Sequence, residues 1–275
     1  FGKLNNTMEF RRIRFFNSGL VYKNLAYKVQ FDFAHGKATF KDAFIEIKKL
    51  PIFGNLKVGH MKEPLRMEVQ TSSKYLLLME RANVADFVPE RSTGIMLHNV
   101  IKNRFTYAVG AFRTSDSFGN DYGRDDESVT GRLTGLPFVN DDKNMLLHLG
   151  GGYSHRNSNT DTYKIEARPE SHMGPKYIST GTIANVNNVD IFSGEMAFVW
   201  GSFSLQGEYI AANVSSTDSI NSYAFSSYYA AVSFFLTGEH RNYLKSAGAF
   251  GRVSPKNNYD GEGGFGAIEL VARYA

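Results

Sequence analysis

The chain of 275 residues contains no cysteine, one tryptophan and only seven prolines. Without cysteine it can form neither a disulfide framework nor a thiolate metal site, so a zinc finger and redox chemistry at sulfur are excluded. No apolar run approaches the roughly 18 residues that a membrane-spanning helix needs; the longest are short stretches such as 75–79 and 230–236. A helical membrane protein is therefore excluded, and only strands remain as elements that can cross a bilayer.

The chain also lacks a recognisable leader and a strong excess of one charge. Its first residues, Phe1-Gly2-Lys3-Leu4, are not a basic segment followed by an apolar core, and we expect the gene to begin elsewhere. The net charge of +4 fits an enzyme, a nucleic-acid binder or a pore. Because cations alternate with acids and form no basic stripe with aromatic partners, the sequence indicates no nucleic-acid partner.

Phenylalanine and tyrosine are abundant, with 22 and 15 residues, and 26 glycines are spread along the chain. This composition favours strands and tight turns. In Tyr27-Lys28-Val29-Gln30-Phe31-Asp32-Phe33 the odd positions are large and apolar, whereas the even ones are charged or carry an amide. Such a strand has two chemically opposite faces. The same alternation recurs at 104–112, 203–209 and 268–274.

The pattern predicts an all-β chain of about thirteen strands with little helix. The predicted strands are residues 8–17, 20–34, 39–50, 55–61, 94–101, 104–114, 128–139, 144–156, 162–169, 190–200, 202–214, 226–239 and 267–275. Tilted strands of about 9 to 11 residues cross the hydrocarbon layer. Short turns such as 17–19 alternate with long polar loops such as 115–127, which is typical of a transmembrane antiparallel β-barrel.

A soluble antiparallel sandwich or small barrel is the alternative, because its strands alternate too. Soluble strands are commonly five or six residues long, and the predicted ones are longer and rich in Phe, Tyr, Val and Leu. Their polar face is dense in Arg and Lys, as a water-filled lumen permits.

Residues 71–86 break the alternation and predict a short helix. Thr71 or Ser72 can cap its N-terminus, good helix formers follow, and Pro89 lies just beyond it. Lys74 and Arg81 are seven residues apart and would lie on one face of that helix. They are either solvated cations on a surface helix or, if the segment folds into a barrel lumen, the charge of a constriction.

Several short motifs follow one another in a characteristic order. They are Phe10-Arg11-Arg12-Ile13-Arg14, Lys41-Asp42-Ala43-Phe44, Leu56-Lys57-Val58-Gly59, Thr71-Ser72-Ser73-Lys74, Met79-Glu80-Arg81, Gly94-Ile95, Ala167-Arg168-Pro169-Glu170, and Phe235-Leu236-Thr237-Gly238-Glu239 with Tyr243 beyond it. No single motif is specific. The ordered set covers nearly the whole chain and resembles the phosphate-selective porin O/P family.

The resemblance implies a single barrel domain over residues 1–275, in a homotrimer of barrels with about sixteen strands each. Thirteen predicted strands then imply that about one strand precedes Phe1 and about two follow Ala275. The location implied is the bacterial outer membrane, in contact with its lipid and lipopolysaccharide.

For the site, the resemblance implies that Ser73, Lys74 and Arg81 hold phosphate at the narrowest zone of the pore. A multivalent oxyanion accepts bidentate hydrogen bonds from guanidinium, faces a point charge from lysine and accepts a hydrogen bond from a hydroxyl. Asp42 matches an acidic residue of the same zone. It would weaken the positive field enough for the anion to leave again.

The resemblance also implies a ladder of lumen cations, formed by Arg11, Arg12 and Arg14 and, later in the chain, Lys164 and Arg168. Strand alternation sends Arg12 and Arg14 to one face and Arg11 to the other unless the strand end twists. Two acids accompany the later pair within 163–170, and 69–70 contain no lysine. Weak anion preference is therefore an alternative to strict selectivity for phosphate or polyphosphate.

Patterns of enzyme sites are weak, and we expect no enzyme, cofactor or metal. The spacing G-x-G-x-x-G at 261–266 lacks the strand and helix of a dinucleotide site. The seven histidines form no zinc motif, and the acids at 121–127 and 141–142 match no calcium loop. A Ser, His and acid assembled by the fold, a non-conducting structural or adhesive barrel, and a general diffusion porin remain as alternatives.

Overall fold

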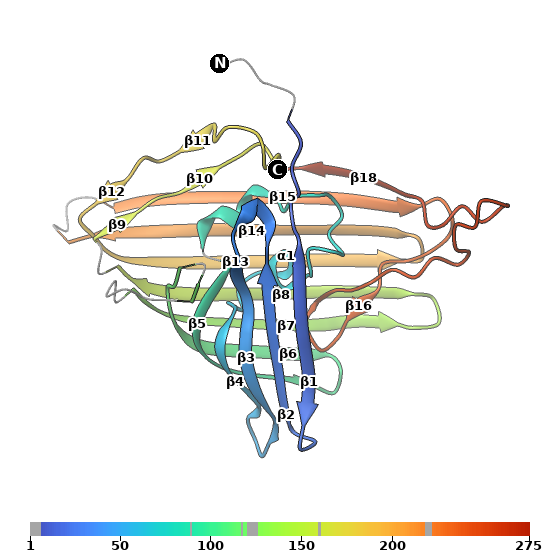
Figure 1. Cartoon of the computed structure of the whole chain (residues 1–275), viewed down its shortest axis with the longest axis horizontal. Coiled ribbons are helices and arrows are strands. Elements are labelled where there is room, and N and C mark those ends of the chain that lie inside the picture. Colours follow the sequence, from blue (N-terminus) through green and yellow to red (C-terminus); the bar gives the residue numbers. More distant parts are fainter. Residues whose placement is uncertain (1–6, 89, 117, 120–125, 159–160, 218–221) are drawn as a thin grey trace.

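The computed structural model describes residues 7–88, 90–116, 118–119, 126–158, 161–217 and 222–275. Its main element is a twelve-stranded antiparallel sheet in which each strand pairs with its neighbours in chain order (Figure 1). The strands are β1 (Arg14–Val21), β2 (Leu25–Asp32), β3 (Thr39–Leu50), β4 (Gly54–Lys62), β5 (Arg91–Ile101), β6 (Phe105–Arg113), β7 (Glu127–Asn140), β8 (Met145–Asn157), β13 (Val186–Trp200), β14 (Phe203–Ser216), β15 (Ser222–Phe235) and β18 (Glu269–Tyr274). The predicted all-β fold is confirmed.

Short elements fill the connections. The helical ones are η1 (Ala34–Gly36), α1 (Met67–Gln70) and η2 (Asn83–Phe87). Three two-stranded ladders pair β9 (Thr162–Tyr163) with β12 (Ile183–Ala184), β10 (Glu166–Ala167) with β11 (Ile178–Ser179), and β16 (Tyr243–Leu244) with β17 (Ala249–Phe250). Among the described residues, no helix has the length and apolar character to cross a membrane.

The long strands turn apolar side chains outward and polar ones inward. On β13, Phe192, Met196 and Trp200 are exposed, whereas Ser193 and Glu195 are buried on the opposite face. The inward row of β14 is likewise buried and reads Ser204, Gln206 and Glu208 before it becomes apolar. A soluble sandwich buries its apolar face, so this inverted arrangement agrees with a barrel surrounded by lipid.

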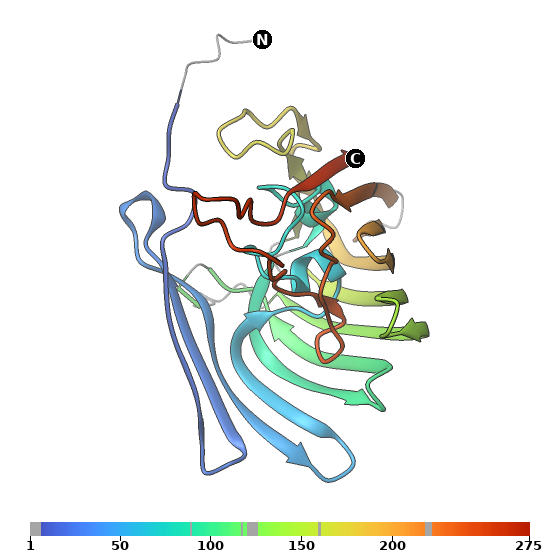
Figure 2. The same cartoon turned by 90° about the vertical axis from the view of Figure 1, so that its right-hand side faces the viewer.

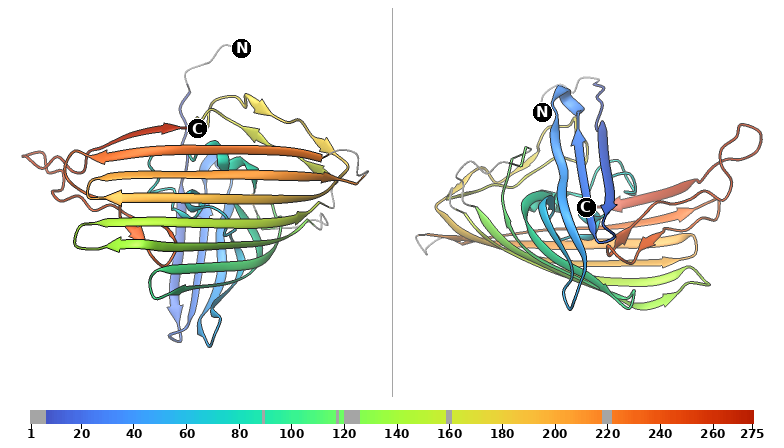
Figure 3. Two further views of the ribbon diagram at one scale, coloured as in Figure 1. Left: turned by 180° about the vertical axis from the view of Figure 1, so that it is seen from behind. Right: turned by 60° about the horizontal axis from the view of Figure 1, so that its bottom comes forward.

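The sheet is strongly twisted and curls into a deep trough. Its end strands, β1 and β18, each pair with one neighbour. The first strands run steeply across the later ones (Figure 3), as the right-handed twist of long sheets requires. Figure 2 shows two connections inside the trough, the blue-green one after β4 and the red one before β18. The concave face of the sheet is therefore filled by loops of the same chain.

The connection after β4, residues 63–88 and 90, is called the inward loop. Its root is Glu63, which is 1% exposed and accepts hydrogen bonds from Arg156 (2.7 Å), Ser92 (2.5 Å) and Thr130 (3.0 Å) on the wall. Further along, apolar side chains of the loop pack against inward-facing apolar residues of β13 and β14: Leu65, Ala82, Phe87 and Val88 against Val189, Ile191 and Ile210. The loop is thus anchored by a buried ion pair and by a small apolar core.

The connection before β18, residues 236–268, is called the returning segment; its fold back into the trough was not predicted from the sequence. Tyr243 Oη lies 2.5 Å from Nδ1 of the fully buried His148, whose Nε2 lies 3.1 Å from Glu195. Arg132 donates to Glu195 and to the carbonyl of Ala247 (3.1 Å). Polar contacts with the buried side chains of His148 and Arg132 therefore hold this segment inside the sheet.

Two strand predictions were wrong. The first turn lies at residues 22–24, where Tyr22 and Lys23 have positive φ values, and not at 17–19. Gly19 lies within β1 opposite Tyr27, where a Cβ would approach the Tyr27 ring to 2.8 Å, so this position needs glycine for packing and not for a turn. Residues 162–169 form the short β9 and β10 and not a long strand of the sheet, which reduces thirteen strands to twelve. Their apolar side chains, including Ile165, pack onto the inward loop instead.

The predicted helix over 71–86 was also wrong. Helix is limited to α1 before Thr71 and to the 3-10 turn η2, and residues 71–82 between them are irregular. Thr71 ends α1, with its backbone N–H on the Met67 carbonyl, and does not begin a helix. In this segment, the backbone bonds to side chains and packs against the wall of the sheet instead of forming helical hydrogen bonds. Tertiary packing therefore overrides the local helix propensity.

Candidate functional site

Cationic side chains line a cavity of about 600 Å³ between the first strands and the inward loop, called here the cationic cavity. Its charged lining consists of Arg12, Arg14, Lys28, Lys57, Lys62, Lys74, Arg91 and Asp42. Seven cations thus face one carboxylate. In a cleft with low-dielectric walls, charge of one sign raises the local concentration of the opposite ion, so this cavity favours anions.

Ser73 and Lys74 lie together on the loop side of the cationic cavity. Ser73 Oγ accepts a hydrogen bond from Arg14 at 3.2 Å, and the same guanidinium donates to Asp32 at 2.8 Å. Lys74 Nζ lies 5.7 Å from the ring centre of Phe16. Within the part of the chain that the structure describes, Lys74 pairs with no carboxylate, so its ammonium group is available to a solute anion.

Asp42 lies on the wall side of the cavity and is 6% exposed. It accepts hydrogen bonds from Lys28 at 2.5 Å and from Arg91 at 2.8 Å. Arg91 also pairs with Glu90 at 2.7 Å. The carboxylate therefore neutralises part of the positive charge on the wall while leaving the loop-side cation unpaired.

Lys28, Lys57, Lys62 and Arg91 were not predicted as site residues. Lys62 Nζ donates to the carbonyls of Val69 (2.6 Å), Gln70 and Thr71 at the end of α1. Lys57 Nζ lies 4.5 Å from the Phe44 ring centre. The alternating strand pattern indicates that such side chains point inward. It does not indicate which inward side chains, from four different strands, lie close together.

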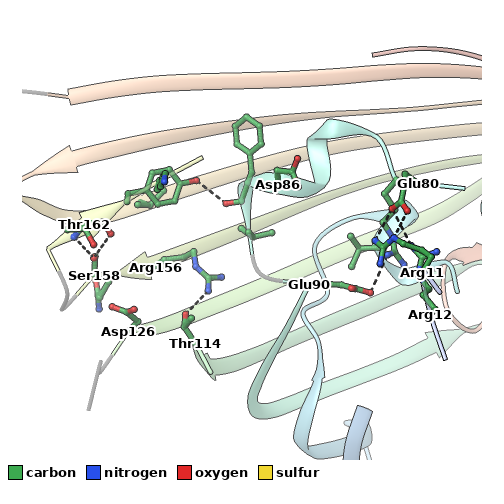
Figure 4. A pocket seen from close by; sticks show the side chains of 18 residues that line it. Arg11, Arg12, Glu80, Asp86, Glu90, Thr114, Asp126, Arg156, Ser158 and Thr162 are labelled. Carbon is green, nitrogen blue, oxygen red and sulfur yellow. Dashed lines mark hydrogen bonds and ion pairs between the residues drawn. The ribbon is translucent and has the colours of Figure 1, made fainter. Parts of the chain in front are cut away.

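Arg81 does not face the cationic cavity but a second cavity of about 610 Å³, called the outer cavity (Figure 4). Its Nε donates to the Glu68 carbonyl (3.0 Å), one Nη donates to the Thr71 carbonyl (3.1 Å), and the other lies 3.4 Å from Glu90. The predicted pairing with Lys74 assumed a continuous helix. In the irregular segment the two cations lie in different cavities, and Arg81 braces the loop.

Arg11 and Arg12 both reach the tip of the inward loop. Glu80 accepts two hydrogen bonds from Arg11 (2.5 and 3.0 Å) and one from Arg12 (3.3 Å), as drawn in Figure 4. Strand alternation does not separate these arginines, because β1 begins only at Arg14. Burial alone would raise the pKa of Glu80, but the Arg11 hydrogen bond and the charges of both arginines lower it. Glu80 is therefore ionised at neutral pH.

Lys164 lies between β9 and β10 and Arg168 directly follows β10, so neither lies on a spanning strand. Lys164 lines the outer cavity and pairs with Glu166 at 2.6 Å. Arg168 is outside the described lining of both cavities. Other cations of the outer cavity are paired as well, for example Arg156 with Glu63 and Arg81 with Glu90. With five cations and four carboxylates in its described lining, the outer cavity is close to balanced in charge, whereas seven cations and one carboxylate line the cationic cavity.

Comparison with known proteins identifies relatives of this chain. Residues 2–275 match the profile of the family described as "Phosphate-selective porin O and P". Porin O of Pseudomonas aeruginosa is 26% identical over 302 residues, which covers 99% of this chain and 67% of that protein.

Solved structures of OmpT, an outer membrane protein of Vibrio cholerae, are also similar. The trimer form matches with a TM-score of 0.42 and 11% identity over 96% of this chain and 91% of its own. A second OmpT structure matches with a TM-score of 0.39 and 11% identity, and the match covers 96% of this chain and 89% of that one. These similarities are too low to add to the assignment. The family match and the inverted polarity of the sheet instead lead to one conclusion: the chain belongs to the phosphate-selective porin O and P family and is a porin of the bacterial outer membrane.

Proposed function

We propose that this porin passes small anions in preference to cations and that the cationic cavity is its main anion-binding site. The excess of seven cations over one carboxylate in that cavity carries the proposal. A solute anion there would meet the unpaired ammonium of Lys74, the hydroxyl of Ser73 and the guanidinium of Arg14. Arg81 acts by bracing the loop that presents these groups.

Phosphate is the leading solute, with polyphosphate as a related one. Its oxygens can accept from guanidinium, ammonium and hydroxyl groups at the same time, and Arg14 with Ser73 and Lys74 offers all three. Asp42 disfavours permanent capture, because a site must bind weakly enough to release the ion. The near-balanced charge of the outer cavity favours weak anion preference there and stronger binding in the cationic cavity.

The first test is single-channel recording in a planar bilayer. We expect the reversal potential in a salt gradient to show anion preference and low phosphate to block chloride current. Lys74→Gln should weaken the block about tenfold, the loss of one hydrogen bond to a charged group. Lys143→Gln, which removes a lysine from the exposed turn at 141–144, is the matched control and should leave the block unchanged.

Two other functions give different results in the same recording. A general diffusion porin would conduct without phosphate block, and Lys74→Gln would then change nothing. A non-conducting structural or adhesive barrel would show no channels. Either result would overturn the proposal.

The expected homotrimer and the contacts with lipid and lipopolysaccharide are proposed as well. The exposed apolar rows, such as Phe192, Met196 and Trp200, support a lipid contact. Native mass spectrometry of protein extracted in mild detergent tests both, through the mass of the assembly and of any lipopolysaccharide retained. A monomeric species without retained lipopolysaccharide would contradict them.

A further inference from the structure

Glu80 contacts Arg11 and Arg12 in the way that a bound oxyanion would. Both carboxylate oxygens are engaged, one by Arg11 Nε at 2.5 Å and the other by Arg11 Nη2 at 3.0 Å, with Arg12 Nη2 3.3 Å from the second. This is the two-point contact through which guanidinium recognises carboxylate and phosphate. The two arginines therefore form an anion site that a side chain of the protein itself occupies.

The position of this site connects the two cavities. Glu80 and Arg11 line the outer cavity, and Arg12 lines both the outer and the cationic cavity. An anion that moves from the balanced outer cavity toward the cationic cavity passes Arg12. Whatever occupies Arg12 therefore influences entry.

The carboxylate can leave without unfolding the loop, because separate contacts hold the backbone near it. Arg273 on β18 donates to the Glu80 carbonyl at 3.0 Å, and Arg12 Nη1 donates to the Met79 carbonyl at 3.4 Å. The side chains are partly accessible, with 17% of Glu80 and 30% of Arg11 exposed. A partly solvated ion pair is weak, so solute anions at high concentration can compete with it.

We propose that Glu80 is a tethered counter-ion, which occupies an anion site at Arg11 and Arg12 and limits the anion selectivity and anion occupancy of the pore. The inference rests on the proposed function, since it concerns the same anion pathway. It assigns to Glu80 a role opposite to that of the cavity cations: the carboxylate competes with solute anions and keeps the outer cavity nearly neutral.

The test is Glu80→Gln, which keeps the shape of the side chain and removes its charge. The permeability ratio of chloride to potassium should rise by a factor of about five, the contribution of one unit charge at contact distance in water. Block by inorganic phosphate should occur at a correspondingly lower concentration. The double variant Arg11→Gln/Arg12→Gln should not respond to the addition of Glu80→Gln, because the site is then absent.

Two controls separate charge from folding and from long-range fields. Glu80→Asp keeps the charge and should keep wild-type selectivity. A disturbed loop would alter the selectivity of both variants, whereas a counter-ion effect alters that of Glu80→Gln alone. Glu127→Gln removes a carboxylate that lies outside the described lining of both cavities, pairs with Arg113 at 3.9 Å and is 65% exposed; it should have little effect.

The outcomes distinguish this inference from the proposed function. If the wild-type pore prefers cations, the proposed function fails, but a shift of Glu80→Gln toward anions still supports the counter-ion. If the wild-type pore prefers anions and Glu80→Gln behaves like it, or if Glu80→Gln shifts selectivity equally in the Arg11→Gln/Arg12→Gln background, only the counter-ion inference is overturned.

Discussion

Asp42 occupies a particular place among the charges of the cationic cavity, because its carboxylate is the only one in the described lining. It bridges Lys28 and Arg91 on the wall, opposite the loop-side Lys74. The cavity therefore has two charge environments, a partly neutralised wall and an unpaired ammonium. An anion would be drawn to the loop side.

Asp42→Asn should increase anion selectivity and slow the release of phosphate. The substitution leaves Lys28 and Arg91 without their shared carboxylate, and one unit charge changes the local anion concentration by a factor of about five. The measurement is the duration of phosphate-induced blocking events in single-channel records. Asp141→Asn, at an exposed turn where the side chain is 79% accessible, is the control. Blocking events of unchanged length in Asp42→Asn would contradict a role for this carboxylate in release.

The inward loop is the element that converts a lined trough into a binding site, and a few buried contacts set its position. Glu63 anchors the root, Lys62 binds three carbonyls near α1, and Arg81 ties residues 68 and 71 to Glu90. Burial alone would raise the pKa of Glu90, but the charges of Arg91 and Arg81 lower it well below its usual range. The Glu90 carboxylate, which pairs with Arg81, therefore stays ionised at neutral pH.

Glu63→Gln should loosen the whole loop. Removing one partner of a buried ion pair costs about 3–5 kcal/mol, and Arg156, Ser92 and Thr130 lose a charged acceptor at once. We expect faster cleavage by trypsin after Lys74 or Arg81 and noisier single-channel currents. Glu262→Gln, which changes an exposed carboxylate of the returning segment, serves as control. Equal cleavage rates in wild type and Glu63→Gln would show that the apolar core of the loop suffices to hold it.

At the scale of the molecule, the sheet is organised around an inside that is polar and an outside that is apolar. Outward-facing residues of neighbouring strands lie side by side, with Leu133 of β7 opposite Tyr107 of β6 in the antiparallel register. Leu133 is 69% exposed. Such a row would aggregate in water, and its burial in lipid is what stabilises a barrel in the outer membrane.

Leu133→Arg tests this organisation. Arginine on the lipid face near the middle of a strand should cost about 2–4 kcal/mol of membrane stability and should reduce folding into bilayer vesicles. Tyr22→Arg, in a turn and 87% exposed, should fold normally. In a soluble sandwich the exposed Leu133 would accept arginine without cost, so equal folding yields of the two variants would contradict the membrane face.

The sequence by itself determined the fold class, because alternation with period two decides which side chains share a face whatever the strands pair with. It also showed the polar face that carries Lys28, and its ordered motifs indicated the porin family, whose pattern singled out Asp42. It did not determine the first turn, since Gly19 is explained by the Tyr27 ring across the hairpin. Nor did it show that residues 162–169 form two short strands outside the large sheet.

Only the tertiary structure decided which charges meet. Lys74 and Arg81 lie in different cavities because the loop between them follows wall contacts and not helical periodicity. Arg11 and Arg12 converge on Glu80 across almost 70 positions of the chain. Such contacts depend on how the sheet curls and where its loops fold back. Local patterns contain no information on distances between segments far apart in the chain, and an ion pair is decided by distance.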